Sequence, residues 1–227
     1  MTIALFGATG GTGRELITKA LEADHEVRAL TRRPSKLSAN EDVTTIEGNV
    51  LNRDSVEATI QDANAVTCLL GRTANNPDDV VSRGTENIIN VMIETDIDRL
   101  IVVTSMGLGS SVRQIPWYVR LANVTVLHDL IADKARQEEL VASSPLYWTI
   151  VRPGGLTNER GTGEYVHGVD LDVPAGPIPR ADVAEFLLIL AQTNNYLRQA
   201  PVVTTKRGID AKFLRDQVTS VTKRLIQ

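Results

Sequence analysis

Cysteine, histidine and long apolar runs are scarce in this chain of 227 residues, and each scarcity excludes a class of protein. Cys68 is the only cysteine, so an internal disulfide and a cysteine-based metal cluster are excluded. It lies in the apolar stretch AVTCLL, where we expect a small buried hydrophobic residue. The three histidines, His25, His128 and His167, match no metal-binding spacing, and we expect no metal site.

The chain also lacks an excess of positive charge and a membrane-spanning run. Its formal net charge is -4, whereas nucleic acids and membrane surfaces attract clustered basic residues. No stretch approaches the ~18 uninterrupted apolar residues that a bilayer crossing needs, and the first residues show no signal-peptide pattern. We therefore expect a cytoplasmic protein that binds neither nucleic acid nor membrane. A small-molecule substrate and a monomer or weak homodimer are expected on other grounds.

Apolar runs alternate with segments of helical period along most of the chain. Strands are expected at 3–6, 26–31, 43–47, 65–70, 100–104, 147–156 and 201–205, and helices at 12–23, 54–61, 78–95, 124–142, 181–192 and 210–224. Continuously apolar strands, each followed by a helix, predict a doubly wound α/β fold with a parallel sheet covered on both faces. The length fits one domain over 1–227, with a loop at 106–123 and an irregular stretch at 153–180 left for a pocket.

The stretch IALFGATGGTGREL places glycines where the first strand ends and the first helix begins. Glycine is needed where a chain turns tightly, where backbone approaches a diphosphate, and where a helix packs close to its strand. The helix then directs its N–H groups and dipole at the phosphates. The pattern predicts a dinucleotide site, against the alternative of a tight turn without ligand, and the contacting residues are Gly7, Thr9, Gly10, Gly11, Thr12 and Gly13.

The end of the second strand selects the dinucleotide. An acid there would bind the ribose 2'-hydroxyl of NAD, but the sequence RALTRRPSK offers Thr31, Arg32 and Arg33. Asp24 lies before this strand, at the end opposite to the one where the ribose is expected. The planar guanidinium of arginine suits a 2'-phosphate, so Arg32 and Arg33 favour NADPH or NADP over the alternative of plain surface arginines.

The ends of later strands nominate further neighbours of the cofactor, because ligands bind at the carboxyl ends of parallel strands. For Arg72 a solvated surface position is an equal alternative. These neighbours are Asn49, Val50, Leu70, Gly71 and Arg72.

With the glycine motif, TRR, GNV, LLG, VVTS and YWTIVRPGGL in this order, the chain resembles the atypical short-chain dehydrogenase/reductases of the NmrA-like, NAD(P)H-binding type. Within them it looks closest to flavin reductase/biliverdin-IXβ reductase proteins. The resemblance implies a Rossmann-type sheet with a small C-terminal substrate-binding portion. It also implies NADPH along the carboxyl edge of the sheet and hydride delivery to a bulky acceptor lying on the nicotinamide.

The resemblance assigns catalytic roles to two residues. Ser105, in VVTSMG, occupies the position of the active-site serine, as a donor to a substrate oxygen or to the nicotinamide carboxamide. Lys134 lies on the inward stripe of its helix, either in the catalytic-lysine position or paired with Glu138 one turn on. Leu130 stands where the motif Y-x-x-x-K has its proton-donating tyrosine, which puts ordinary ketone chemistry in doubt.

The remaining residues of the site would surround the acceptor. Tyr118 and His128 are the candidates to replace the missing acid. The expected role of Tyr118 is nevertheless that of a packing or lid residue, and the expected role of His128 is that of a surface group. Three arginines are candidates to bind propionates or a phosphate of the acceptor, with a plain surface position as the alternative for each. They are Arg113, Arg120 and Arg152. The pocket would contain Met106, Trp117 and Tyr118, with Thr104, Pro153, Gly154 and Gly155 beside the nicotinamide.

Hydride transfer to a flavin or a linear tetrapyrrole fits the missing tyrosine, because an extended π system spreads the developing charge and water can supply the proton. The sequence therefore predicts an NADPH-dependent reductase with Ser105 as hydrogen-bond donor and Lys134 as electrostatic support. One alternative is an NmrA-type protein that binds NADP(H) as a redox signal without turnover. A sugar-nucleotide epimerase or dehydratase is less favoured, because such enzymes carry a larger substrate domain than the ~80 residues after the sixth strand.

Overall fold

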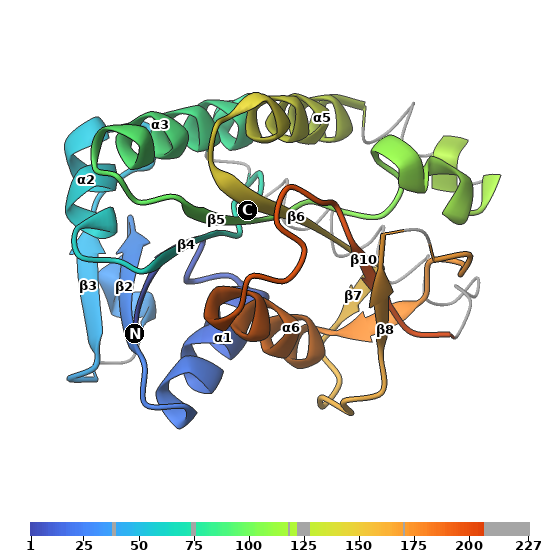
Figure 1. Ribbon diagram of the computed structural model, residues 1–227, viewed down its shortest axis with the longest axis horizontal. Coiled ribbons are helices and arrows are strands. Elements are labelled where there is room, and N and C mark those ends of the chain that lie inside the picture. Colours follow the sequence, from blue (N-terminus) through green and yellow to red (C-terminus); the bar gives the residue numbers. More distant parts are fainter. Residues whose placement is uncertain (38–39, 74–75, 118, 122–127, 170, 207–227) are drawn as a thin grey trace.

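The computed structural model describes residues 1–37, 40–73, 76–117, 119–121, 128–169 and 171–206. Its centre is an eight-stranded sheet in the order β3-β2-β1-β4-β5-β6-β10-β8, in which only β8 runs antiparallel to its neighbour (Figure 1). The strands are β1 (Thr2–Phe6), β2 (Glu26–Thr31), β3 (Val43–Glu47), β4 (Ala65–Cys68), β5 (Arg99–Val103), β6 (Tyr147–Pro153), β8 (Val166–Gly168) and β10 (Val202–Thr204).

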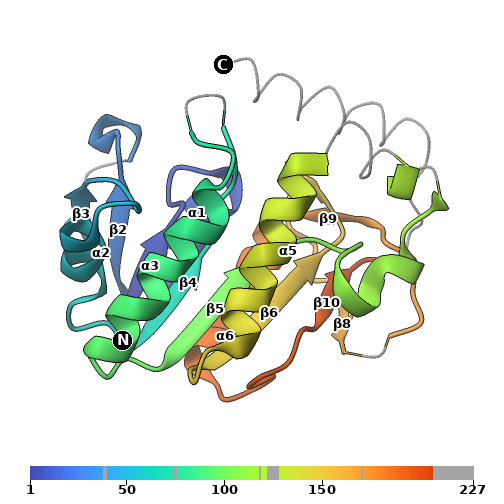
Figure 2. The same ribbon diagram turned by 90° about the horizontal axis from the view of Figure 1, so that it is seen from above.

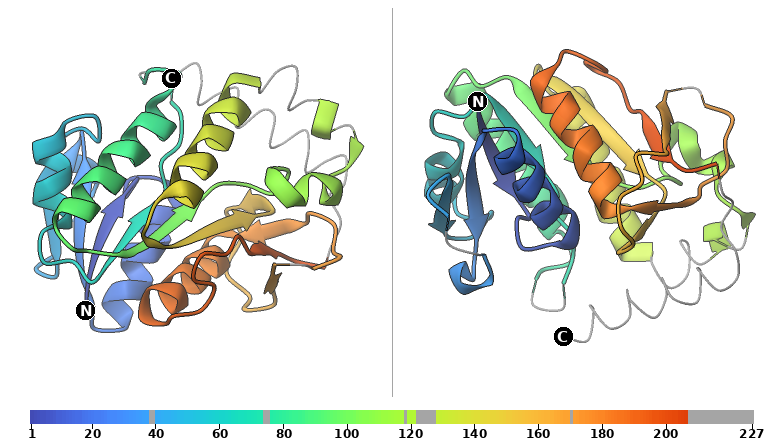
Figure 3. Two further views of the ribbon diagram at one scale, coloured as in Figure 1. Left: turned by 45° about the horizontal axis from the view of Figure 1, so that its top comes forward. Right: turned by 90° about the horizontal axis from the view of Figure 1, so that it is seen from below.

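Helices cover both faces of the sheet, so the molecule has three layers (Figures 1 and 2). One face carries α2 (Arg53–Ile60), α3 (Val80–Glu94) and α5 (His128–Ser143). The other face carries α1 (Gly11–Glu22) and α6 (Arg180–Gln192), which lie side by side in Figure 3. This arrangement confirms the predicted doubly wound α/β fold.

Alternate residues of each central strand enter two separate cores. In β1, Ala4 and Phe6 pack with α2 and α3, whereas Ile3 and Leu5 pack with α1 and α6. Because both faces of these strands are buried, their sequences are apolar without interruption. Burial on both sides explains why the strands could be recognised from apolar runs alone.

The part of the chain beyond the sixth strand extends one end of the sheet. A two-stranded sheet forms from β7 (Gly155–Thr157) and β9 (Pro177–Pro179), so the stretch 153–180 is more regular than expected. Segment 106–123, expected as a loop, contains a 3-10 helix at Gly109–Gln114 and helical residues at 117 and 119–121. The helix expected at 210–224 lies outside the described residues.

The inward face of α5 contains three buried polar side chains, those of Asp133, Gln137 and Glu138. The Asp133 carboxylate accepts the backbone N–H groups of Val81 and Ser82, both at 3.0 Å, at the first turn of α3. Gln137 donates to Thr85 Oγ1 at 2.8 Å. The carboxylate of Asp133 therefore caps α3, whose own N-cap residue makes no side-chain cap.

We predict that Asp133→Ala lowers the free energy of unfolding by about 2 kcal/mol, because two buried N–H groups lose their acceptor. Urea denaturation followed by circular dichroism measures the loss. Glu139→Ala is the control, since Glu139 is exposed on the same helix, and it should change the free energy by less than about 0.5 kcal/mol. Equal effects of the two substitutions would contradict the capping role.

Candidate functional site at the carboxyl edge of the sheet

Strands β1, β2, β4, β5 and β6 run in one direction, so the segments that follow them meet at one edge of the sheet. The chain leaves β1 toward β2 and β3, and then crosses to β4 on the other side of β1. This point, where the strand order reverses, is where open α/β sheets bind ligands. The glycine-rich turn lies directly beside it.

Gly7 opens the turn in a conformation that suits glycine alone. Its φ is +89°, and a Cβ there would lie 2.5 Å from the carbonyl oxygen of Leu69, after β4. The N–H of Gly10 donates to the carbonyl of Gly7 at 3.0 Å and closes the turn. A side chain at Gly7 is thus excluded both by backbone conformation and by the neighbouring strand.

Gly13 lets helix α1 approach this turn closely. A Cβ on Gly13 would lie 2.5 Å from the carbonyl oxygen of Gly7 and 2.8 Å from that of Ala8. Gly13 is buried, whereas Gly10 and Gly11 are exposed at the start of the helix. The predicted reason for the glycine spacing, close packing of helix and strand, is therefore visible in the contacts.

The first turn of α1 fits a diphosphate. Its N-cap is Gly10, which has no side chain to cap the free N–H groups, and the first turn contains no acidic residue. Uncapped N–H groups and the positive end of the helix dipole attract phosphate oxygens. The residues present fit the group that the sequence predicts here.

Arg32 and Arg33 follow β2 at the same edge, and both are exposed. The Arg32 guanidinium donates to the side-chain oxygen of Asn76, and the Arg33 N–H donates to Thr31 Oγ1 at 3.1 Å. Asp24 lies before β2, at the opposite edge. The position that selects between the two nicotinamide dinucleotides thus carries positive charge.

The residues nominated as further neighbours of the cofactor have mixed environments. Val50 is buried, and a Cβ on Gly84 of α3 would lie 2.7 Å from it, whereas the side-chain oxygen of Asn49 accepts the N–H of Leu51 at 3.1 Å. Leu70 is half-buried and packs on the core next to α3.

Gly71 and Arg72 complete the segment after β4. A Cβ on Gly71 would meet no atom within 4 Å, so only a ligand would require glycine there. The Arg72 guanidinium pairs with Asp78. The sequence left two alternatives for Arg72, a cofactor contact and a solvated surface position. Neither predicts the ion pair with Asp78.

Ser105 follows β5 and is partly exposed at the edge. Thr104, predicted beside the nicotinamide, is buried, and its hydroxyl donates to Glu138 Oε1 at 2.7 Å. The Lys134 ammonium donates to the carbonyls of Val103 and Thr104, at 3.4 and 3.3 Å. Burial lowers the pKa of Lys134. Lys134 therefore holds the backbone from which Ser105 projects.

Two alternatives left open by the sequence, a pair of Lys134 with Glu138 and an Arg152 that meets the acceptor or the solvent, are not found, and one buried ion pair accounts for both. Glu138 does not pair with Lys134, because its carboxylate accepts Arg152 Nε at 3.0 Å and Arg152 NH2 at 2.7 Å. Arg152 is also hydrogen-bonded to Ser110 Oγ at 3.0 Å and is buried. It is therefore not available to a propionate or phosphate of the acceptor.

The residues predicted around the acceptor lie in part on the surface. Trp117 is 71% exposed, whereas Met106 is buried against Ile115 and Val202. A Cβ on Gly154 would lie 2.3 Å from the carbonyl of Gly176, so the segments at 153–155 and 176 touch through backbone. Pro153 ends β6 and Gly155 begins β7. Tyr118 lies outside the described residues.

The other candidates for acid or anion-binding roles are surface groups. His128 is exposed and bonded to its neighbour Asp129, and Arg113 and Arg120 are exposed. Leu130, in place of the motif tyrosine, is half-buried. His128, Arg113 and Arg120 are therefore not buried beside Ser105.

Arg180 was missed by the sequence analysis. It begins α6, and a Cβ on Gly11 would lie 2.6 Å from its Cδ. Only the packing of α6 against α1 brings Arg180 to the glycine turn. The sequence signal was a lone arginine at a helix start, 169 residues beyond Gly11, which indicates nothing about this contact.

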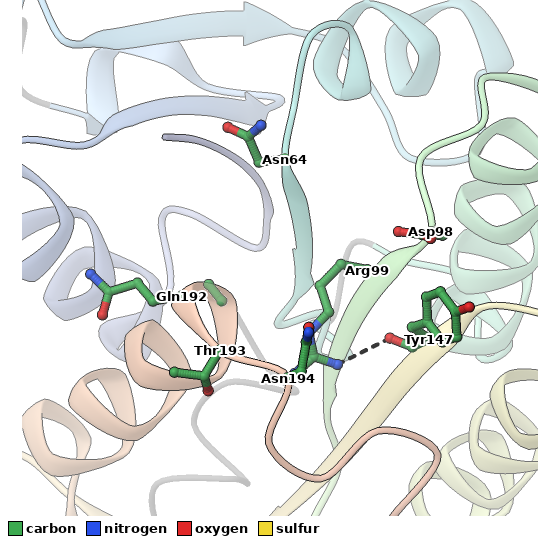
Figure 4. Close-up of a pocket in the computed structure, with 8 residues that line it drawn as sticks. Asn64, Asp98, Arg99, Tyr147, Gln192, Thr193 and Asn194 are labelled. Atoms are coloured by element: carbon green, nitrogen blue, oxygen red, sulfur yellow. Dashed lines mark hydrogen bonds between the residues drawn. The ribbon is translucent and has the colours of Figure 1, made fainter.

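A pocket of about 210 Å³ lies at the opposite, amino-terminal edge of the sheet and is lined by Asn64, Asp98, Arg99, Tyr147 and residues 191–194 (Figure 4). Arg99 is buried, and its guanidinium donates to the carbonyls of Leu190 and Tyr147 and to Thr149 Oγ1. Burial lowers the pKa of Arg99 to about 10. These bonds tie the end of α6 to β5 and β6, far along the strands from the glycine turn.

Within the described residues, no group of three or more His, Cys, Asp or Glu side chains is arranged to hold a metal ion. Across the same part of the chain, none of the helices combines the length and apolar character needed to span a membrane.

Known proteins share the sequence pattern and the fold. A family model described as NAD(P)H-binding matches residues 7–194. Protein TIC 62 of the pea (Pisum sativum) chloroplast is 24% identical over 82% of this chain, which spans only 39% of that protein's length. Oxidoreductase ordB of Dothistroma septosporum is 22% identical over 98% of this chain and 90% of that protein. The solved structure of ChuY, an anaerobilin reductase of Escherichia coli O157:H7, has a TM-score of 0.80 at 24% identity, covering 93% of this chain and 100% of that one.

We predict that Gly13→Ala destabilises the fold by about 1–2 kcal/mol. Alanine gains about 1 kcal/mol of helix propensity, but the clash with two carbonyl oxygens costs about 2–3 kcal/mol. Chemical denaturation measures the difference. Gly71→Ala is the control, because its Cβ would enter open space. A Gly13→Ala protein as stable as the wild type would show that the helix does not need this close approach.

Proposed function

The chain belongs to the NAD(P)H-binding family, and from this membership we propose that it is an NADPH-dependent reductase whose acceptor is a conjugated molecule such as a flavin or a linear tetrapyrrole. The observation that carries the cofactor half of the proposal is the exposed, uncapped start of α1 above a turn that admits no side chain at Gly7 or Gly13. Arg32 and Arg33, exposed after β2, favour NADPH over NADH.

The acceptor half of the proposal rests on the environment of Ser105. Leu130 stands where a tyrosine would donate a proton to a carbonyl substrate, and Lys134 is bonded to backbone carbonyls. A conjugated acceptor needs no strong acid, because its π system spreads the negative charge that develops on reduction. Bound NADPH would supply the hydride and water the proton, so that the products would be the reduced acceptor and NADP⁺.

The residues of this chain would position the two molecules. Lys134 holds the end of β5, so the Ser105 hydroxyl is presented to an oxygen of the acceptor or to the nicotinamide carboxamide. The ion pair between Glu138 and Arg152 joins α5 to β6 beneath this point. Ser105 has no hydrogen-bond partner among the described residues, so its hydroxyl is available for such a contact.

Similarity to ordB, an oxidoreductase, and to ChuY, an anaerobilin reductase, supports the proposal of a reductase. One observation favours a second function. With Leu130 in place of the tyrosine, the same cofactor site would also suit a protein that binds NADP(H) as a redox signal and turns nothing over.

We predict that Arg32→Ala weakens NADPH binding by about 10- to 100-fold, the value of one or two charge-assisted hydrogen bonds. NADH lacks the 2'-phosphate, so its affinity should stay within about twofold. Calorimetric titration with each coenzyme measures both values. An equal loss for the two coenzymes would remove the 2'-phosphate role from Arg32.

We predict that the wild-type protein oxidises NADPH when FMN, riboflavin or biliverdin is present, followed by absorbance of the reduced nicotinamide. Ser105→Ala should lower turnover by about 100-fold and leave NADPH affinity unchanged, because the hydroxyl acts only on the reacting end. Ser110→Ala is a matched control on the neighbouring segment.

One result would contradict the reductase, and another would contradict the role of Ser105. Tight NADPH binding without oxidation by any of these acceptors would favour the redox sensor. Full turnover in Ser105→Ala would remove Ser105 from the mechanism and leave the cofactor assignment intact.

A further inference from the structure

Arg180 occupies the space that the missing side chain of Gly11 leaves open. A Cβ on Gly11 would lie 2.6 Å from Arg180 Cδ and 2.9 Å from its Nε. The two residues begin α1 and α6, which pack against each other along their lengths (Figure 3, right). The glycine in the middle of GGTG is thus explained by an arginine from the far end of the chain.

The Arg180 guanidinium joins two parts of the edge. Its NH1 lies 3.4 Å from Thr12 Oγ1 in the first turn of α1. Its Nε donates to the side-chain oxygen of Asn158 at 3.0 Å, in the segment on the acceptor side. One side chain therefore contacts both the predicted diphosphate site and the segment that follows β7.

The same segment is fixed to α6 by a buried carboxylate. Asp182 accepts the N–H groups of Thr162 and Gly163 at 2.8 and 3.1 Å, and the hydroxyl of Thr162 at 3.1 Å. Asp182 lies two residues after Arg180 and is 1% exposed. Residues 158–163 are thereby held to the first turn of α6 at both ends.

We propose that Arg180 binds the diphosphate of the dinucleotide and couples its binding to the order of residues 158–163. This inference rests on the proposed function. A guanidinium donates two parallel hydrogen bonds to phosphate oxygens, and the uncapped N–H groups of α1 supply the others. Arg180 keeps its Nε bond to Asn158 while its NH1 lies next to Thr12 of α1. Cofactor binding then fixes the orientation of Arg180, and through it the position of Asn158.

The test is calorimetric titration of Arg180→Ala with NADPH and with NADH. Because both coenzymes carry the diphosphate, both affinities should fall by the same factor, about 10- to 50-fold. Arg32→Ala affects NADPH alone, so the two arginines are distinguishable. Lys19→Ala is the matched control: it removes a cation from the same helix pair, where Lys19 and Glu185 lie 3.3 Å apart, and should leave both affinities unchanged.

Gly11→Ala gives a second test without altering the arginine. The added methyl group would displace Arg180 Cδ, which belongs to a flexible side chain, so thermal stability should be kept while both coenzymes bind more weakly. Hydrogen exchange provides a readout of the coupling. NADP⁺ should slow exchange at residues 159–163 in the wild type, and should have little effect there in Arg180→Ala.

Several results would overturn the inference. Wild-type affinity for both coenzymes in Arg180→Ala would remove Arg180 from the site and leave the proposed function standing. Weakening of NADPH alone would assign Arg180 to the 2'-phosphate instead. A wild-type protein that binds neither coenzyme would overturn the proposed function together with this inference.

Discussion

The close approach of helix α1 to the backbone of the first turn is the constraint on which the rest of the site depends. Gly13 lies against the carbonyls of Gly7 and Ala8, and Gly7 lies against Leu69, the residue that follows β4. This packing leaves the first N–H groups of α1 exposed at the point where the strand order reverses. An anion placed there would meet backbone donors from one side and Arg180 from another.

The polar inward face of α5 has a supporting role at the same edge. Burial of a charge is costly unless it is paired, and each charged group on this face has several partners. Glu138 accepts both Arg152 and Thr104, and Lys134 binds the last carbonyls of β5. These bonds set the position of the strand ends next to Ser105.

Local features of the fold and site could be predicted from the sequence, and pairings between distant elements could not. The apolar runs of β1 and β5 indicate that these strands are buried on both faces, and the glycine spacing indicates the turn at Gly7. The partner of Glu138 depends on how α5 lies over β6, which no residue spacing reveals. Arg180 reaches Gly11 only after α6 has packed against α1. The sequence likewise does not reveal that Arg152 is buried in an ion pair with Glu138, because this pair also depends on how α5 lies over β6.

Arg99 fixes helix α6 to the sheet at the edge opposite the glycine turn. Its guanidinium ties α6 to β5 and β6 at the amino-terminal edge through the backbone carbonyls of Leu190 and Tyr147 and through the hydroxyl of Thr149. Most of these acceptors are backbone groups, which a substitution of the neighbouring side chains leaves in place. The acceptors of these bonds lie at the start of β6, at the end of α6 and just beyond it, and not in residues 153–180. Substitutions in that segment would therefore leave this junction between α6 and the central strands in place.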